Sequence, residues 1–364
     1  MRIRELRIKH GYTQNYAASC LHICQNTYSR YENGKRQIPT HLLLSLADLY
    51  HTSTDYILGL TDNPIPHLRN PTKGASSMPK ITSILCLLDI QTGEVTELKR
   101  FPRLMEAPFF RGENELLYNA GGRIFRLNPA TGETGEIPTG ECIHCNNDHV
   151  LSPDGTMLAV SHSPETDWQS RIYILGLDPV TPPRLVTPLG PSYLHGWSPD
   201  GRTLAYCASR NGEYDVYTIP AESGADGGEE TRLTETPGLN DGPEYSPDGK
   251  YIYFNSVRSG LMDCWRMDAD GRNPVRLTDN GRNNWFPHIS PDGTVIAYIS
   301  YDPAEVRPDD HPANKNVEIR RMNPDGTDDR TVVKFFGGQG SLNVNSWMPD
   351  SRRLAFVKYE PVQE

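Results

Sequence analysis

The tetrapeptide Ser-Pro-Asp-Gly occurs four times, beginning at Ser152, Ser198, Ser246 and Ser290. Two altered copies, RGEN and MPDS, stand at residues 111–114 and 348–351, so successive copies are 41 to 58 residues apart. Self-similarity at such a period predicts stacked structural repeats. The tetrapeptide itself suits a tight turn, because proline presets φ, aspartate bonds back to the backbone and glycine accepts a left-handed conformation.

A strand and then a hairpin follow these turns. The strands after the turns are LLYNA, MLAVSH, TLAYCAS, YIYFNS, VIAYIS and RLAFVKY. The region opens with a hairpin at 82–98 that no turn precedes, and it closes with a turn and strand at 348–359 that no hairpin follows. A ring resolves this order, because the last strands and the first hairpin can complete one four-stranded blade. The pattern therefore predicts a six-bladed β-propeller, which leaves no free sheet edges.

The repeat of turn, strand, hairpin and Arg-Leu-Thr over residues 81–364 resembles the TolB-like (PD40 repeat) propeller family. The WD40 alternative is weaker, because no blade ends in Trp-Asp. TolB proteins act in the periplasm, but the first ten residues here, MRIRELRIKH, are too charged to form the apolar core of a secretory signal. No apolar run approaches the roughly 18 residues of a membrane helix. We therefore expect a cytoplasmic protein without a membrane partner or the TolB transport role.

The first sixty residues carry a different pattern, with five short helical segments separated by tight turns. Expected segments are 1–9, 13–21, 25–31, 41–50 and 53–60, with Gly34 in a left-handed cap. The motifs Thr13-Gln14, Leu21-x-Ile23 and RYENGK at 30–35 resemble the Cro/phage-repressor (Xre) helix-turn-helix type. Two positions depart from that family, since His22 replaces the turn glycine and Cys24 replaces the Ser or Thr cap.

The resemblance implies that residues 1–62 bind double-stranded DNA, with the second helix of the motif in the major groove. Mapped onto this sequence, the base-reading side chains are Gln25, Asn26 and Arg30, which suit adenine and guanine edges. Phosphate contacts map to Gln14, Thr27 and Lys35. The open alternatives are a merely solvated polar face and a protein-binding module.

Charge is distributed unevenly along the chain. The whole chain carries −10, and residues 1–62 hold seven Lys and Arg against five Asp and Glu, or +2. The remainder is therefore −10 − 2 = −12, which repels nucleic acid and assigns any DNA contact to the N-terminal part. Because one small head binds weakly, two heads on a palindromic operator are expected, from a homodimer or from a ligand-driven assembly.

These observations predict a multidomain protein of α and β class. An all-α five-helix domain occupies 1–62, a proline-rich linker occupies 63–80, and an all-β propeller with a shared closing blade occupies 81–364. An insertion, YDPAEVRPDDHPANK at 301–315, joins two strands of one blade. We expect it to form a flap over the mouth of the central funnel.

Innermost strands converge on the propeller axis, so the residues just before each turn should form a polar ring. These candidates are Glu106, Asn146, Asn147, His149, Tyr193, His195, Asp241, Glu244, Asn284, Trp285, His288, Asn343 and Asn345. Amides and carboxylates bind hydroxyl-rich molecules, and the aromatic residues offer stacking faces. The ring predicts a ligand sensor, with a saccharide favoured and a protein partner as an alternative.

Other functions remain open at this stage. His149, His195 and His288 could hold a divalent metal in the funnel. The same histidines with Glu244 could perform acid–base work in a carbohydrate lyase or hydrolase, although we favour a protein that is not an enzyme. A protein-interaction scaffold is a further alternative. The pair Cys142 and Cys145 has the spacing of half a zinc site, but the sequence offers no second pair.

Overall fold

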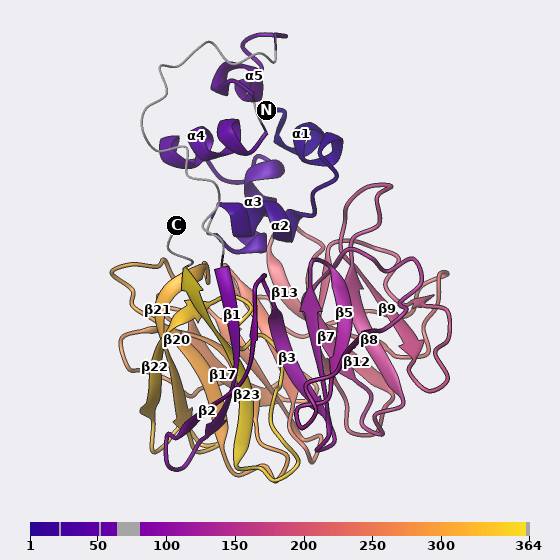
Figure 1. Ribbon diagram of the computed structural model, residues 1–364, viewed down its shortest axis with the longest axis vertical. Coiled ribbons are helices and arrows are strands. Elements are labelled where there is room, and N and C mark those ends of the chain that lie inside the picture. Colours follow the sequence, from indigo (N-terminus) through magenta and orange to yellow (C-terminus); the bar gives the residue numbers. More distant parts are fainter. Residues whose placement is uncertain (22, 51, 64–80, 362–364) are drawn as a thin grey trace. The chain divides into compact units, whose positions relative to one another are not determined.

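The computed structural model describes residues 1–21, 23–50, 52–63 and 81–361 (Figure 1). The chain divides into two compact units, Met1–Ile81 with Pro361–Glu364, and Thr82–Glu360. The expected linker at 63–80 lies outside the described residues apart from Asn63, and so does His22. No described helix is long and apolar enough to cross a membrane.

The N-terminal unit, here called the head, has five helices in its described residues, as the sequence predicts. They are α1 (Ile3–Lys9), α2 (Gln14–Cys20), α3 (Gln25–Glu32), α4 (Thr40–Leu49) and α5 (Thr54–Leu58). Cys24 caps α3, because its Sγ accepts a hydrogen bond from the Thr27 amide at 3.4 Å. Gly34 has a φ of 68°, which confirms the expected left-handed turn. Cysteine thus performs the capping role that the family gives to Ser or Thr.

A buried ion pair joins the helices of the head. Arg7 Nε lies 2.5 Å from Glu32 Oε1, with both side chains at most 1% exposed. Gln14 Nε2 donates to the other carboxylate oxygen at 2.7 Å. This network links α1, α2 and α3 and fixes the angle at which α3 is presented.

The second unit contains six antiparallel sheets arranged in sequence order. Five of these blades have four strands each. They are β3 (Glu106–Arg111), β4 (Glu115–Ala120), β5 (Arg123–Leu127) and β6 (Thr134–Glu136); β7 (Cys145–Leu151), β8 (Met157–His162), β9 (Arg171–Gly176) and β10 (Arg184–Leu185); β11 (Ser192–Trp197), β12 (Thr203–Ser209), β13 (Tyr214–Pro220) and β14 (Thr231–Arg232); β15 (Asn240–Tyr245), β16 (Tyr251–Ser256), β17 (Asp263–Asp268) and β18 (Val275–Arg276); and β19 (Asn283–Ile289), β20 (Ile296–Tyr301), β21 (Ala313–Met322) and β22 (Arg330–Gly338).

The remaining blade closes the ring, because it joins the two ends of the unit. It contains β2 (Val95–Phe101), β1 (Ile81–Asp89) and β23 (Arg353–Pro361), in that order. The purple β1 and the yellow β23 lie side by side in Figure 1. Ion pairs tie the same strands, with Arg352 Nε 2.5 Å from Asp89 and Lys358 Nζ 2.5 Å from Glu97. The predicted six-bladed ring with a shared closing blade is confirmed.

The closing blade differs from the expectation in one detail. Its innermost position holds an isolated bridge, Trp347 to Leu354, in place of a full fourth strand. The preceding segment directs its polar groups elsewhere: Gly340 O accepts from the Ala107 amide, and Asn345 Nδ2 donates to Ile289 O. Bonds to the adjacent blades thus replace part of a ladder with β23.

The four Ser-Pro-Asp-Gly turns share one hydrogen-bonding geometry. In the first, Ser152 Oγ donates to Asp154 Oδ1 at 2.6 Å and accepts from the Met157 amide at 2.9 Å. Gly155 has a φ of 69°. The serine thus closes the loop between the innermost strand and its neighbour, and the glycine supplies a backbone conformation that other residues rarely adopt.

The Arg-Leu-Thr motif has a physical explanation in the contacts of Asp263. Its Oδ1 accepts from Thr278 Oγ1 at 2.8 Å, and its Oδ2 lies 2.9 Å from Arg276 Nη2. Thr278 Oγ1 in turn accepts from the Cys264 amide. Asp215, Arg232 and Thr234 repeat the arrangement in the preceding blade. The motif therefore fastens the end of the outermost strand to the third strand.

Replacing the buried Asp263, which holds Arg276 and Thr278, should destabilise the propeller. Asp263→Ala should lower the free energy of unfolding by about 2–4 kcal/mol, because Arg276 and Thr278 lose a buried partner. Urea unfolding followed by tryptophan fluorescence measures this. Asp279→Ala is the matched control, since Asp279 pairs with the same arginine but is 82% exposed, and it should cost less than about 1 kcal/mol. Equal losses in the two variants would contradict the assignment.

Candidate functional site

Backbone bulges redirect the innermost strands toward the axis. The pairing of each of the strands β3, β7, β11, β15 and β19 with its neighbour shifts register near its middle. At three of these bulges Ala107, Gly242 and Phe286 have φ values of 50°, 60° and 56°. A bulge sets two residues against one and re-aims the side chains. The positive φ of Ala107 and Phe286 is the strain that this geometry carries.

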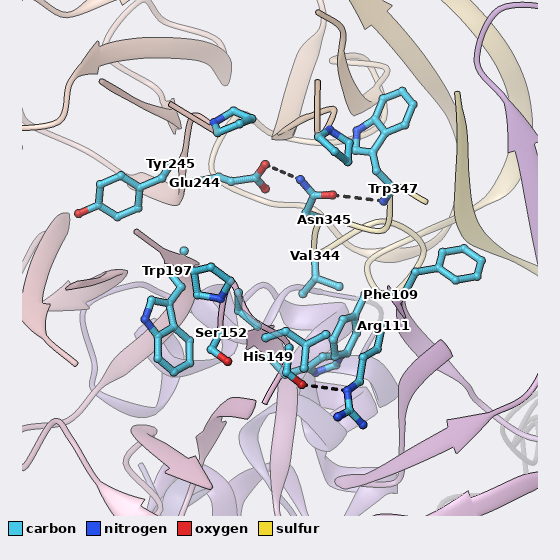
Figure 2. Close-up of a pocket in the computed structure, with 18 of the residues that line it drawn as sticks. Phe109, Arg111, His149, Ser152, Trp197, Glu244, Tyr245, Val344, Asn345 and Trp347 are labelled. Atoms are coloured by element: carbon cyan, nitrogen blue, oxygen red, sulfur yellow. Dashed lines mark hydrogen bonds between the residues drawn. The ribbon is translucent and has the colours of Figure 1, made fainter. Parts of the chain in front are cut away.

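A cavity of about 640 Å³ opens on the axis, beside the Ser-Pro-Asp-Gly turns. Every blade contributes to its wall, as Figure 2 shows for ten labelled residues. Its side-chain lining includes Phe109, Phe110, Arg111, His149, Ser152, Asp154, His195, Trp197, Glu244, Tyr245, Ile289, Val344, Asn345 and Trp347. The size falls within the range of small-molecule sites, and the lining combines aromatic walls with a few polar groups.

Glu244 is held by three polar contacts. Its Oε2 lies 2.6 Å from His288 Nδ1, and its Oε1 accepts from the Ile289 amide at 3.0 Å and Asn345 Nδ2 at 2.7 Å. Asn345 Oδ1 accepts from the Trp347 amide. Figure 2 shows the bond between Glu244 and Asn345 along one side of the cavity. The carboxylate is thereby fixed in place by groups from two other blades.

A second charged group lies beside it. His195 Nε2 is 3.1 Å from Asp241 Oδ1. Burial alone would lower the pKa of His195, but the carboxylates of Asp148 and Asp241 outweigh burial and hold its pKa above the ordinary value. Burial raises the pKa of Asp148 to about 6. The acids around this part of the axis thus favour the protonated form of His195.

Two further axial residues are forced toward their neutral forms. Burial raises the pKa of Glu106 to about 7, although a hydrogen bond from Asn147 Nδ2 at 3.1 Å opposes the shift. Burial lowers the pKa of His149 to about 4. His149 Nε2 donates to Ala107 O at 2.9 Å, and its buried Nδ1 has no partner. The His149 side chain is fully buried, so this nitrogen does not face the open cavity.

The structure brings four of the thirteen predicted ligand residues to this cavity, namely His149, His195, Glu244 and Asn345. Asp241 and His288 lie directly behind them as hydrogen-bond partners. The others do not line it: Glu106, Asn146, Asn147, Tyr193, Asn284, Trp285 and Asn343. Asn284, for example, bonds within its own blade, where Ser300 Oγ donates to its Oδ1 at 2.8 Å.

The three candidate metal ligands are not placed around one ion. His149, His195 and His288 bond separately to Ala107, Asp241 and Glu244. Across residues 1–21, 23–50, 52–63 and 81–361, no group of three or more His, Cys, Asp and Glu side chains is arranged to hold a metal. The described residues thus give no support to a metal site at these histidines, and the metal expectation stays a prediction.

The Cys142-x-x-Cys145 segment is likewise explained by the repeat. β7 begins at Cys145, so Cys142 precedes the strand. Both thiols are free and buried, and Cys145 Sγ donates to Cys142 O at 3.3 Å. Burial raises the pKa of Cys145 to about 12, which leaves a packed, unreactive thiol.

The 301–315 insertion does join β20 to β21, but it contacts the opposite end of β19 from the cavity. Asn283 Nδ2, in the first residue of β19, donates to Val306 O, and the His311 ring lies 4.2 Å from the Trp285 ring. The cavity touches β19 at its last residue, Ile289. Those ends are about 20 Å apart along a strand. The His311 ring also lies 5.1 Å from the Phe286 ring, which is 5.8 Å from the ring of the cavity residue His195. The insertion therefore packs beside the axial residues, and its role as a flap over the funnel mouth stays a prediction.

The candidate DNA-binding residues all lie in the helix-turn-helix unit. Gln14 begins α2, Gln25, Asn26 and Thr27 form the first turn of α3, Arg30 lies in its last turn, and Lys35 follows Gly34. Two of them have structural roles as well. Gln14 binds Glu32, and Thr27 Oγ1 accepts from Arg36 Nη1.

None of the aromatic residues that line the cavity was among those predicted from the sequence. Trp197 and Trp347 line it together with Tyr245 and Phe109. A signal was available, because Trp197 and Trp347 stand one residue before a Ser-Pro-Asp-Gly turn or its altered copy. Alternation from the turn places that position on the same strand face in every blade.

Comparison with known proteins agrees with both units. The family model described as "TolB beta propeller domain" matches residues 195–308, and the one described as "Helix-turn-helix" matches residues 3–57. An uncharacterised protein of Agrobacterium fabrum, Atu1656, is 42% identical over 299 residues, which is 82% of this chain and 98% of that protein.

Two further matches separate the units. A solved structure from Agrobacterium tumefaciens, described as a putative TolB, superimposes with a TM-score of 0.73 at 42% identity, over 78% of this chain and 99% of that one. The HTH-type transcriptional regulator ImmR of Bacillus subtilis is 50% identical over 58 residues, which is 16% of this chain and 46% of that protein. The second match concerns a head-sized segment alone.

The raised pKa of Glu106 predicts a specific pH dependence of stability. Its folded pKa of about 7 exceeds the ordinary 4.5, so the stabilisation from the bound proton is complete below about pH 4 and is lost as pH rises through 7. Glu106→Gln stays neutral, so its advantage over the wild type should grow by on the order of 3 kcal/mol between pH 4 and 8. Urea unfolding at several pH values measures it. Glu133→Gln, at an exposed turn, should show no such trend, and a flat difference for Glu106→Gln would refute the prediction.

Proposed function

The chain belongs to the TolB-like β-propeller family and carries an Xre-type helix-turn-helix domain, and on this basis we propose that it is a DNA-binding transcriptional regulator whose propeller senses a small molecule. The observation that carries the proposal is the presence, in one chain, of a DNA-binding head and an axial cavity lined by all six blades. Such a protein works where the DNA is, in the cytoplasm.

The head supplies the features that operator binding needs. The Arg7–Glu32–Gln14 network joins α3 to α1 and α2 and makes the head rigid. Rigid presentation lowers the entropic cost of groove binding. The head also carries a net charge of +2 in a chain with an overall charge of −10, which favours its approach to phosphates.

The propeller supplies the features of an effector site. Glu244, Asn345 and His195 offer polar groups among aromatic side chains in a cavity of about 640 Å³. This combination suits a hydroxyl-bearing molecule such as a saccharide, because hydrogen bonds orient it and rings cover its apolar faces. A protein segment that enters the cavity is the alternative effector.

Two heads acting together complete the proposal. One small helix-turn-helix unit contacts a single half-site, and joining two units raises the effective concentration of the second. We therefore propose that the regulator binds a palindromic operator as a homodimer, with the effector changing the affinity for that operator.

Operator binding and the effector response test the proposal together. Operators selected from random DNA by the full chain should bind specifically at moderate salt, and a saccharide that raises the melting temperature should change operator affinity at least fivefold. Fluorescence anisotropy with labelled duplexes measures both. Failure to select any sequence would end the regulator proposal.

Two head variants should separate base reading from phosphate contact. Arg30→Ala should cost about 1–3 kcal/mol on the selected operator and relax the preference at one base pair. Lys35→Ala should weaken all duplexes alike and reduce the salt slope by about 1. Arg272→Ala, an exposed change on the propeller (79% side-chain exposure), controls for lost charge and should leave DNA affinity unchanged. If Arg30→Ala weakens all sequences equally, Arg30 does not read a base.

A further inference from the structure

The side-chain donors of the axial cavity are largely used by the protein itself. Trp197 Nε1 donates to Gly201 O at 2.9 Å, and Trp347 Nε1 donates to His288 O at 3.0 Å. Asn345 Nδ2 donates both to Glu244 Oε1 and to Ile289 O. Two indoles and one amide, the groups expected to bind a ligand's oxygen atoms, therefore have no N–H left to offer.

The positive groups of the lining are committed in the same way. Arg111 Nη1 lies 3.0 Å from Glu115 and 2.6 Å from Asp178, while its Nε donates to Gly155 O. His195 Nε2 is paired with Asp241. An anionic ligand, such as a phosphate or a uronate, would have to compete with carboxylates that already hold these cations.

Acceptors remain available. His149 Nδ1 is not one of them, because the His149 side chain is fully buried and this atom is out of reach of the open cavity. Glu244 keeps acceptor capacity on Oε2, which has one bonded neighbour, His288. Asn345 Oδ1 accepts one bond, from the Trp347 amide, and retains its second lone pair.

Aromatic side chains surround these acceptors. Phe109, Trp197, Tyr245 and Trp347 come from four different blades and line the same cavity as Glu244 (Figure 2). The faces of aromatic rings carry partial negative charge and attract cations by about 0.5–2 kcal/mol. Carboxylate, lone pairs and ring faces thus favour the same kind of ligand group.

We propose that the axial cavity binds an organic cation, a molecule whose protonated amine donates to Glu244 in a cavity that aromatic residues also line. The inference rests on the proposed effector role of the cavity and specifies its chemistry. An amino sugar and a linear polyamine share this chemistry, and a disaccharide of the former matches a volume of about 640 Å³.

Calorimetric titration of the full chain tests the proposal with matched probes. The glucosamine disaccharide and spermidine are the cationic probes, the di-N-acetylated disaccharide is the neutral one, and a glucuronic-acid disaccharide is the anionic one. At least one cationic probe should bind tenfold or more tightly than the neutral and anionic probes. The disaccharide and spermidine arms distinguish an amino sugar from a polyamine.

A charge variant links the binding to the cavity. Glu244→Gln should weaken the bound amine at least tenfold, whereas Glu213→Gln, the same change on an exposed loop between β12 and β13, should leave it unaltered. Should Glu244→Gln fail to fold, the wild type still decides. Its affinity for the amine must then fall as pH rises through the amine's own pKa, and a pH-independent affinity counts against the proposal.

Each remaining outcome is decisive. Equal or tighter binding of the acetylated or anionic probe overturns the cation inference and leaves the cavity as an effector site of different chemistry. Absence of binding by both amines also overturns it. The operator titration then decides separately whether the regulator proposal survives.

Discussion

Pairing between the first and last strands of the propeller is the constraint on which the rest of the structure depends. β1 and β23 are separated by most of the chain, yet they lie next to each other in one sheet, with ion pairs from Arg352 and Lys358 across the seam. A closed ring forces the innermost strands onto one axis. It is this convergence that places Glu244, Asn345 and His195, distant in sequence, within one cavity.

Convergence of the innermost strands does not by itself decide which side chains point to the axis. The bulges in these strands set the direction of the side chains. The turn of backbone at Ala107, Gly242 and Phe286 aims polar residues inward. Because these polar groups are buried, they need hydrogen-bond partners within the protein. His288 and Asn345 are the partners of Glu244.

The two units solve opposite electrostatic problems. The head carries a small excess of positive charge and buries a single ion pair, Arg7 with Glu32, to hold its helices. The propeller carries the net negative charge of the chain, and some of its carboxylates are neutralised in ion pairs such as that of Asp263 with Arg276. In the proposed regulator, repulsion between the acidic propeller and DNA leaves contact with DNA to the head.

The sequence by itself determined the fold class, because the residues that form the turns and the order of the repeats can both be read directly from the sequence. Ser-Pro-Asp-Gly specified the turns, the missing hairpin specified ring closure, and RYENGK with Thr13-Gln14 specified the head. It located the axial residues only as a list, from which His149, His195, Glu244 and Asn345 line the cavity and Asn284 and Asn343 do not. Tertiary structure alone decided which way each side chain points, which donors are already consumed and at which end of β19 the 301–315 insertion packs. A bulge changes which face of the strand each following side chain lies on, and the hydrogen-bond partners of an axial residue come from other blades. The local sequence of a strand therefore predicts neither the direction of its side chains nor their partners.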